Sequence, residues 1–476
     1  MRVDRLSLFS VGILMVWLLL YVLNVMLGLG EGYSTFFLPL SLATLLVVQL
    51  RSERPPFDLA IVFLISCLFF FCIGLILWPF SSVPPTEFAS LVITTFTLAE
   101  FDNASLLTGI SITLTMLAMS SFRAVPSYRM PRVFTPDADT RAQRLYRLGL
   151  MFMVLSMPGV VFELWLQFRY IQGAGYLALY VEGVPTSAWA SFFYSFYTGF
   201  GLALTFAPSR RAFLGPAALY LIMATLDSLK GARGAVIVPL LFITWYYCSR
   251  FDVKVRLGSL ARNMGVLMAL FVFLTYQRDS ELFSASIGQF LVDALSTQGR
   301  SLQLTVLYQQ NANEIARYGN NMVLSNVLIP IIVILHPEVR EAAQSMDQVL
   351  YSNNLKHILT YVLNPDYYFA GGGTGGVYTV ELIEAGIVLF VVLSILLGWM
   401  MAWLPRAMRR PWVRFLSLYV FTTVFYLPRG EFFFNTLIVG KAVFLYILVT
   451  FFEGTVRRLR KKAGAPVQPM TQDVRT

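Results

Sequence analysis

The feature that most constrains this chain is a series of long apolar runs, almost free of charge, that recur along most of its length. A helix needs about 20 apolar residues to cross a bilayer, and in lipid its backbone groups must be bonded within the segment. The sequence therefore predicts an all-α polytopic membrane protein with one integral membrane domain over residues 1–453. We expect twelve spans, near residues 7–28, 34–50, 57–80, 103–122, 147–166, 190–207, 212–227, 233–249, 259–276, 376–403, 414–428 and 432–453.

The composition agrees with a membrane protein and excludes several other classes. Hydrophobic residues make up 57% of the chain and charged residues 13%, whereas a soluble domain is about a quarter charged. The three cysteines fall inside apolar runs, so neither a disulfide framework nor a metal site is predicted. The sequence contains no G-x-x-x-x-G-K-[ST] loop, which argues against an ATP-driven pump. We therefore expect no cofactor and no metal.

The distribution of basic residues predicts which ends of the spans face the cytoplasm. With the N-terminus inside, 26 of the 36 Lys and Arg residues fall in cytoplasmic segments or at their edges. Because cytoplasmic loops are enriched in these residues, we expect both termini inside. The basic tail 454–476 would then contact anionic lipid. No folded basic face accompanies this tail, so no nucleic-acid partner is predicted.

One large segment outside the membrane, residues 277–375, is expected between the ninth and tenth spans. Within it, residues 324–335 are apolar but too short to cross the bilayer, and Pro330 interrupts them. They would either dip into the membrane interface or pack on helix ends. The loop closes with a glycine-rich turn at 371–376.

Charged residues gather at the outer ends of the later spans, where they are candidates for binding an anion. Lys230 and Arg233 lie in the turn between the seventh and eighth spans, and Gly231 and Gly234 would let a ligand approach the backbone there. A cation at the edge of hydrocarbon is costly and therefore commonly functional, and amides that begin a helix favour phosphate. The alternative is a hairpin turn with snorkelling basic side chains.

Further arginines extend this pattern. Arg278 and Asp279 lie where the ninth span leaves the membrane, with ordinary boundary chemistry as the alternative. Arg429 and Glu431, separated by a glycine, lie in the turn between the last two spans. Arg300 in the large loop is an additional candidate. Because guanidinium groups match phosphate oxygens, arginines in matching turns predict a diphosphate clamp.

Candidate proton acceptors lie on the same side of the membrane. Glu381 and Glu384 are three residues apart, which puts both carboxylates on one helix face, with Tyr378 one turn earlier. Burial would raise the pKa of such a carboxylate and suit it to act as a general base; the alternative is a salt bridge to one of the arginines. His336 and His357 in the loop are either catalytic or structural.

Three of these segments resemble bacterial O-antigen polymerases of the Wzy class. They are the Gly-Ala-Arg-Gly turn at 231–234, the long loop that leads into a span with Glu381 and Gly386, and the late Leu-Pro-Arg-Gly-Glu at 427–431. Enterobacterial common antigen polymerases are similar in the same three places. The resemblance covers approximately residues 212–453.

The resemblance implies a GT-C-like membrane glycosyltransferase in the bacterial inner membrane. Such polymerases transfer a growing glycan from undecaprenyl diphosphate to a hydroxyl of a new lipid-linked repeat unit at the periplasmic face. Arg233, Arg278 and Arg429 would hold the diphosphate, and Glu381, Glu384 or Asp279 would be the base. A chain-length regulator is the implied protein partner.

Two other functions stay open at the level of sequence. O-antigen ligases use a loop histidine, for which His336 or His357 would serve. A lipid-linked oligosaccharide flippase would also have many spans, but it should spread cations through its helix interiors and show two pseudo-symmetric halves. This chain instead concentrates charge at outer helix ends of its second half, which favours chemistry at a fixed outer face.

Overall fold

The computed structural model is helical throughout the part of the chain that it describes. It describes residues 5–26, 32–51, 58–81, 96–122, 136–175, 178–183, 191–228, 234–251, 253, 262, 265, 286–340, 343–408, 410–433 and 436–462, and none of these residues forms a strand. The predicted all-α class is confirmed.

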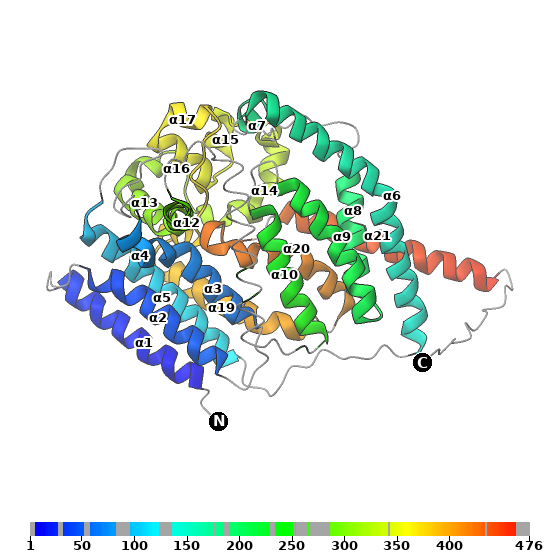
Figure 1. Ribbon diagram of the computed structural model, residues 1–476, viewed down its shortest axis with the longest axis horizontal. Helices are drawn as coiled ribbons and strands as arrows, with labels where there is room; N and C mark the ends of the chain where they lie inside the picture. Colours follow the sequence, from blue (N-terminus) through cyan, green and yellow to red (C-terminus); the bar gives the residue numbers. More distant parts are fainter. Residues whose placement is uncertain are drawn as a thin grey trace.

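The first half of the chain forms two groups of helices, at the left and right of Figure 1. The first group consists of α1 (Arg5–Tyr21), α2 (Tyr33–Leu50), α3 (Leu59–Cys67), η2 (Leu68–Cys72), α4 (Ile73–Leu77) and α5 (Leu98–Phe122). The second consists of α6 (Pro136–Ala174), α8 (Ser191–Phe206), α9 (Arg210–Ser228) and α10 (Gly234–Phe251), with the short α7 (Ala178–Val181) after α6. Short π and 3-10 turns, η1 (Val22–Met26) and η3 (Trp78–Phe80), end the first and third spans.

The second half joins these two groups. Helix α19 (Ile387–Ala407) packs on α5, whereas α20 (Pro411–Tyr426) contacts α3, α8 and α10. The 3-10 turn η9 (Leu427–Arg429) follows α20, and α21 (Thr436–Lys462) completes the described chain. The turn that carries Arg429 therefore lies at the end of a helix that touches both groups.

Among the residues that the structure describes, seven helices are long and apolar enough to cross a membrane, which makes this a multi-pass membrane protein. They are Leu6–Asn24, Tyr33–Leu50, Leu59–Phe80, Leu98–Phe122, Thr140–Ala174, Ile387–Ala407 and Thr436–Thr455. Helices α8, α9, α10 and α20 occupy four more of the predicted segments, and the segment 259–276 lies almost wholly outside the described residues. Twelve spans and the orientation of the chain stay predictions.

The structure divides the predicted span 376–403 into two helices. Helix α18 (Tyr378–Glu384) ends before Gly386, whose φ of 86° lies in the left-handed region, and α19 begins at Ile387. Glycine adopts this conformation without a steric penalty because it has no Cβ. As a result, Glu381 and Glu384 lie on a short helix that precedes the membrane-spanning one.

The predicted large loop is itself helical over its described part. It contains α12 (Ile287–Ser296), η6 (Thr297–Arg300), α13 (Ser301–Ile315), η7 (Met322–Leu324), α14 (Ser325–Leu335), η8 (Pro337–Arg340), α15 (Met346–Tyr351), α16 (Leu355–Leu363) and α17 (Pro365–Phe369). Figure 1 shows α12, α13 and α15–α17 gathered at one end of the bundle. Helix α12 packs on α4 and η6 packs on η2, so the loop docks onto the first group of helices.

Buried polar side chains on one helix cap the end of another. Asp102 on α5 accepts hydrogen bonds from the backbone of Gly32 and from Thr35, whose amide lies 2.8 Å away, and so caps the start of α2. Arg250 on α10 donates to the carbonyls of Leu204, Thr205 and Ala207 at the end of α8. The first and last turns of a helix leave such groups without intrahelical partners, so these contacts satisfy them inside the bundle.

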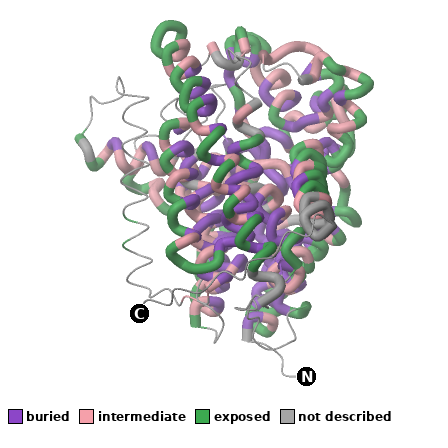
Figure 2. The backbone as a smooth tube through the Cα atoms, turned by 90° about the vertical axis from the view of Figure 1, so that its right-hand side faces the viewer, coloured by how far each residue is buried: buried purple, intermediate pink, exposed green. Residues whose placement is uncertain are grey.

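Apolar packing fills the space between the helices. Figure 2 shows buried residues along the inside of the bundle and exposed ones around its outside. Helices α5 and α19 approach closely: a Cβ added to Gly398 would overlap the carbonyl oxygen of Thr115. Ser111 and Ser394 share a hydrogen bond of 2.9 Å across the same interface. Small residues allow such close contact between membrane helices.

Candidate active site

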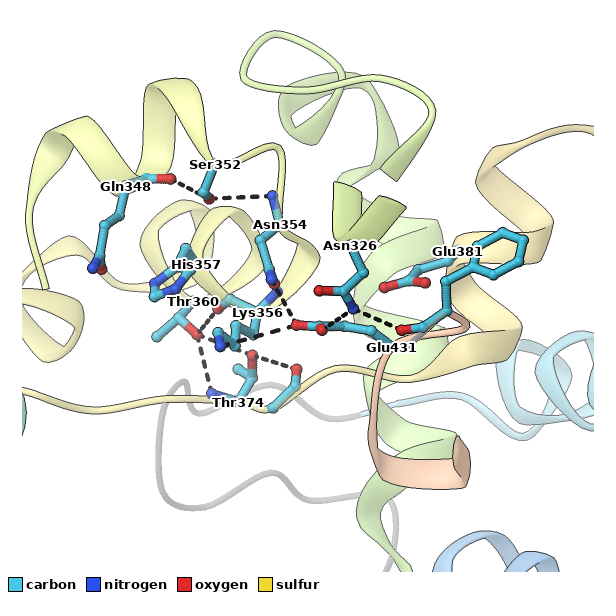
Figure 3. Close-up of polar contacts among 12 residues, drawn as sticks. Asn326, Gln348, Ser352, Asn354, Lys356, His357, Thr360, Thr374, Glu381 and Glu431 are labelled. Carbon is cyan, nitrogen blue, oxygen red and sulfur yellow. Dashed lines mark hydrogen bonds and ion pairs between the residues drawn. The ribbon is translucent and has the colours of Figure 1, made fainter. Parts of the chain in front are cut away.

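The turn after α20 is held in place by polar contacts from α14 and from the start of α16 (Figure 3). Glu431 accepts one hydrogen bond from the side-chain amide of Asn326 at the start of α14 and another, of 2.6 Å, from that of Asn354 before α16. Its carboxylate also lies 3.9 Å from the Lys356 ammonium. Asn326 donates in addition to the carbonyl of Phe433. These contacts fix the chain on the C-terminal side of Arg429.

Arg429 lies beside a second arginine, Arg300. Its guanidinium donates to Oε1 of Gln298 at 2.9 Å, and Gln298 and Arg300 belong to the same 3-10 turn, η6. Burial and the positive charge of Arg429 lower the pKa of Arg300. Both side chains are half-buried, and Arg429 forms no ion pair with any described residue. Two neighbouring cations in this setting are suited to share an anionic ligand.

Two glycines allow η6 to reach this position. A Cβ added to Gly299 would overlap the backbone nitrogen of Gly74, and one added to Gly74 would lie 3.1 Å from the carbonyl oxygen of Ser296. Turn η6 therefore lies directly on the end of η2 and the start of α4 because neither backbone carries a side chain at the contact. Turns η6 and η9 both contact η2, which brings Arg300 and Arg429 together.

The glycine-rich turn borders the same arginine. Tyr367 links this turn to Arg300. Burial and Arg429 lower the pKa of Arg300, whereas the nearby phenol of Tyr367 acts to raise it. The ring of Tyr367 lies where a Cβ of Gly372 would be. Gly371 and Gly375 have φ values of 84° and 85°, which other residues rarely adopt. The turn at 371–376 is thus shaped to receive an aromatic side chain.

The two carboxylates of α18 serve different parts of the site. Glu381 is 1% exposed; its Oε2 accepts from the Phe432 amide at 2.8 Å, and its Oε1 has no hydrogen-bond partner. Burial, helped by the negative charge of Glu431, raises its pKa well above the usual value. Glu384 accepts from the amides of Asn321 and Met322, at 2.6 and 2.9 Å, and so caps η7. Neither forms an ion pair with a described arginine.

A protein-family model described as O-antigen polysaccharide polymerase Wzy matches residues 6–458, nearly the whole chain. The chain belongs to this family. The predicted resemblance, based on motifs in residues 212–453, is confirmed and extends through the first half. No curated protein and no solved structure matches the chain.

Tyr378 is buried beside Glu381 on α18 of this Wzy-family chain. Its ring is fully buried and packs edge-on against Phe63 and Phe71, with ring centroids 6.4 and 6.3 Å away. The prediction that it belongs to the site rested on its position one turn before Glu381. These contacts join α18 to the first group of helices, and the role of Tyr378 in the site stays a prediction.

The two loop histidines are both engaged in local contacts. His336 stacks on Tyr351, with centroids 4.0 Å apart, and its Nδ1 lies 3.1 Å from the Glu338 carboxylate. The Nδ1 of His357 lies 3.1 Å from the Tyr368 hydroxyl, which donates to the carbonyl of Ser345. Burial, with the charge of Lys356, lowers the pKa of His357 to about 3. A group with this pKa is a weak general base at neutral pH.

Four predicted site residues of the Wzy-family chain, Lys230, Arg233, Arg278 and Asp279, lie outside the described residues. Their roles stay predictions.

Sequence reasoning missed the amide and ammonium groups around Glu431. Asn354 carries a recognisable signal, because it caps α16 by accepting from the Lys356 amide at 3.1 Å, and asparagine is favoured at this position. Asn326 is a polar residue in an apolar stretch. Neither signal identifies Glu431, which lies 105 residues after Asn326 and 77 after Asn354.

Proposed function

We propose that this Wzy-family polymerase joins undecaprenyl-diphosphate-linked oligosaccharide repeat units at the periplasmic face of the bacterial inner membrane. A sugar hydroxyl of the incoming unit attacks the anomeric carbon of the growing chain. The new glycosidic C–O bond forms as the C–O bond to the diphosphate breaks, and the hydroxyl proton passes to a base. Undecaprenyl diphosphate leaves. The bond to diphosphate supplies the driving force, so the reaction needs no nucleotide.

The observation that carries this proposal is the pairing of Arg300 with Arg429. Negative charge develops on the diphosphate as the bond breaks, and fixed cations stabilise a transition state best where such charge develops. The guanidinium fork matches the oxygens of a phosphate group. Gln298 orients Arg429 from one side, and Glu431 holds the next turn residues from the other. Lys230, Arg233 and Arg278 are proposed to complete this cradle.

Glu381 is the described carboxylate best suited to accept the hydroxyl proton. One of its oxygens is anchored by the Phe432 amide, and the other makes no hydrogen bond. A raised pKa makes a carboxylate a stronger proton acceptor. Both oxygens of Glu384 are bonded to backbone amides, which leaves Glu384 the weaker candidate. Asp279 is retained as an alternative base.

The decisive experiment is reconstitution with purified protein and a lipid-linked oligosaccharide from the host, without added nucleotide. We expect a ladder of products on a gel. Arg300→Ala and Arg429→Ala should abolish it, while Arg317→Ala, at an exposed arginine of the same loop, should leave it unchanged. A normal ladder from both site variants would contradict the arginine cradle. Glycan that crosses the vesicle bilayer without polymer would indicate a flippase instead.

The orientation is tested separately by cysteine labelling. A cysteine placed in 343–356 should react with an impermeant reagent added outside intact cells whose outer membrane is permeabilised, and one placed after 462 should not. The reverse pattern would place the site in the cytoplasm. A chain-length regulator is the proposed partner, and co-purification from the host would reveal it.

A further inference from the structure

Helix α14 presents an exposed apolar stripe that no described element covers. Ile334 is 76% and Leu335 68% exposed, and these two continue a row of apolar side chains on one face of the helix: Leu324, Val327, Leu328 and Ile331. The spacing of three and four residues is that of a single helix face. None of residues 325–335 is ionisable. Such a surface is costly to leave in water.

The length of α14 excludes a full crossing of the membrane. Its 11 residues extend about 16 Å at 1.5 Å per residue, which is roughly half of a 30 Å hydrocarbon core. A helix of this length reaches into one leaflet at most.

A specific contact joins α14 to a membrane-spanning helix. Pro330 lies inside α14 and has no N–H, so the carbonyl of Asn326, four residues earlier, loses its intrahelical partner. The hydroxyl of Thr436, at the start of α21, donates to this carbonyl at 2.8 Å and lies 3.0 Å from that of Val327. A backbone carbonyl freed within lipid must find a partner inside the protein. This contact supplies one.

The exposed stripe also borders the exposed surface of α21, which is long and apolar enough to span a membrane. Helix α21 packs on α14. Its span Thr436–Thr455 is the least buried of the seven, because only 6% of its most apolar 18-residue stretch is buried inside the protein. Its own exposed apolar residues include Ile438, Phe444 and Ile447. The stripe and this span therefore form neighbouring apolar surfaces, and the bilayer that covers one is available to cover the other.

We propose that α14 lies within one leaflet of the bilayer, with its apolar stripe against lipid acyl chains. Asn326, in the first turn of α14, remains bonded to Glu431 and to the carbonyl of Phe433. Helix α14 thereby anchors the turn of Arg429 at the membrane surface. This inference concerns the position of the loop in the membrane and does not depend on the chemistry proposed above.

Site-directed fluorescence quenching tests the proposal. Single cysteines are introduced by Ile331→Cys and Ile334→Cys after the three buried native cysteines are replaced by alanine. The purified, labelled protein is reconstituted in phosphatidylcholine vesicles that contain a phospholipid with a nitroxide on its acyl chain. Asp366→Cys, at an exposed residue of α17, is the aqueous control, and thermal unfolding verifies that each variant folds.

We expect the nitroxide lipid to quench the labels at 331 and 334 and iodide in the buffer to quench the label at 366. Quenching of the two α14 labels by iodide to the same extent as at 366 would show a stripe in water and overturn the proposal. Protection from both quenchers would overturn it as well, because the stripe would then be covered by protein and not by lipid. In either case the ladder would still report polymerase activity independently.

Discussion

The contact between Glu431 and the two asparagines predicts the effect of a single-atom change. Each carboxylate oxygen of Glu431 accepts from a different side-chain amide, that of Asn326 or that of Asn354. In Glu431→Gln one oxygen becomes an NH2 group. Whichever way the new side chain turns, one asparagine amide then faces a donor and loses its partner.

The magnitude follows from the bonds that are lost. A hydrogen bond to a charged group contributes about 1.5–3 kcal/mol. The ion pair with Lys356 adds about 0–1 kcal/mol, because the ammonium lies 3.9 Å away and its side chain is 47% exposed. We therefore expect Glu431→Gln to weaken the attachment of the turn by about 2 kcal/mol, a roughly 30-fold shift in favour of the detached turn. Arg429, two residues earlier, would lose its fixed position.

A compensating substitution distinguishes this contact from general damage. Asn354→Asp alone places two carboxylates together and should also impair the protein. In the double variant the amide introduced at position 431 can donate to the carboxylate introduced at position 354, and aspartate still caps α16. We expect each single variant to lower the rate of polymer formation at saturating substrate by about tenfold, and the double variant to regain most of it. Glu314→Gln, at an exposed loop carboxylate, is the control.

Two results would refute this reasoning. If both single variants polymerise at the normal rate, the turn does not need these bonds. If the losses in the double variant simply add, the two side chains are not coupled. Thermal unfolding of each purified variant, measured in parallel, separates a displaced turn from a protein that is unfolded throughout.

Three further predictions concern stability and pH. Because the pKa of Glu381 is raised in the folded protein above its ordinary value of about 4.5, the folded state binds more protons than the unfolded one as the pH rises from there, and stability should fall. The curve of melting temperature against pH should be flatter for Glu381→Gln, and an unchanged curve would count against a raised pKa at Glu381. The pKa of His357 is lowered from 6.5 to about 3, so the folded protein should lose stability as the pH falls through this range. His357→Gln should remove this loss of stability in the same assay. Gly398→Ala should destabilise the protein by about 1–3 kcal/mol because the added Cβ would overlap helix α5. Gly440→Ala is the control, since its Cβ would meet nothing within 4 Å. Equal melting temperatures for the two variants would show that α5 and α19 can move apart at little cost.

The helical, membrane-spanning character of this chain follows from local properties of its sequence. Long apolar runs must form helices in lipid whatever their neighbours are, so seven predicted segments coincide with helices able to span. The resemblance to the family could be found in the sequence because two of the three segments that carry it, 231–234 and 427–431, are short and contiguous. The placement of Glu381 and Glu384 on one helix also follows from their spacing.

The composition of the site was decided by tertiary packing. Arg300 and Arg429 are distant in sequence, and they meet because Gly299 and Gly74 allow two turns to touch. Glu431 was expected to accompany Arg429, but its asparagine partners come from helices of the large loop. Gly386 separates α18 from the span that follows it. Such contacts depend on how several helices pack at once, whereas periodicity and spacing describe each helix alone, so only the folded structure determines which side chains meet.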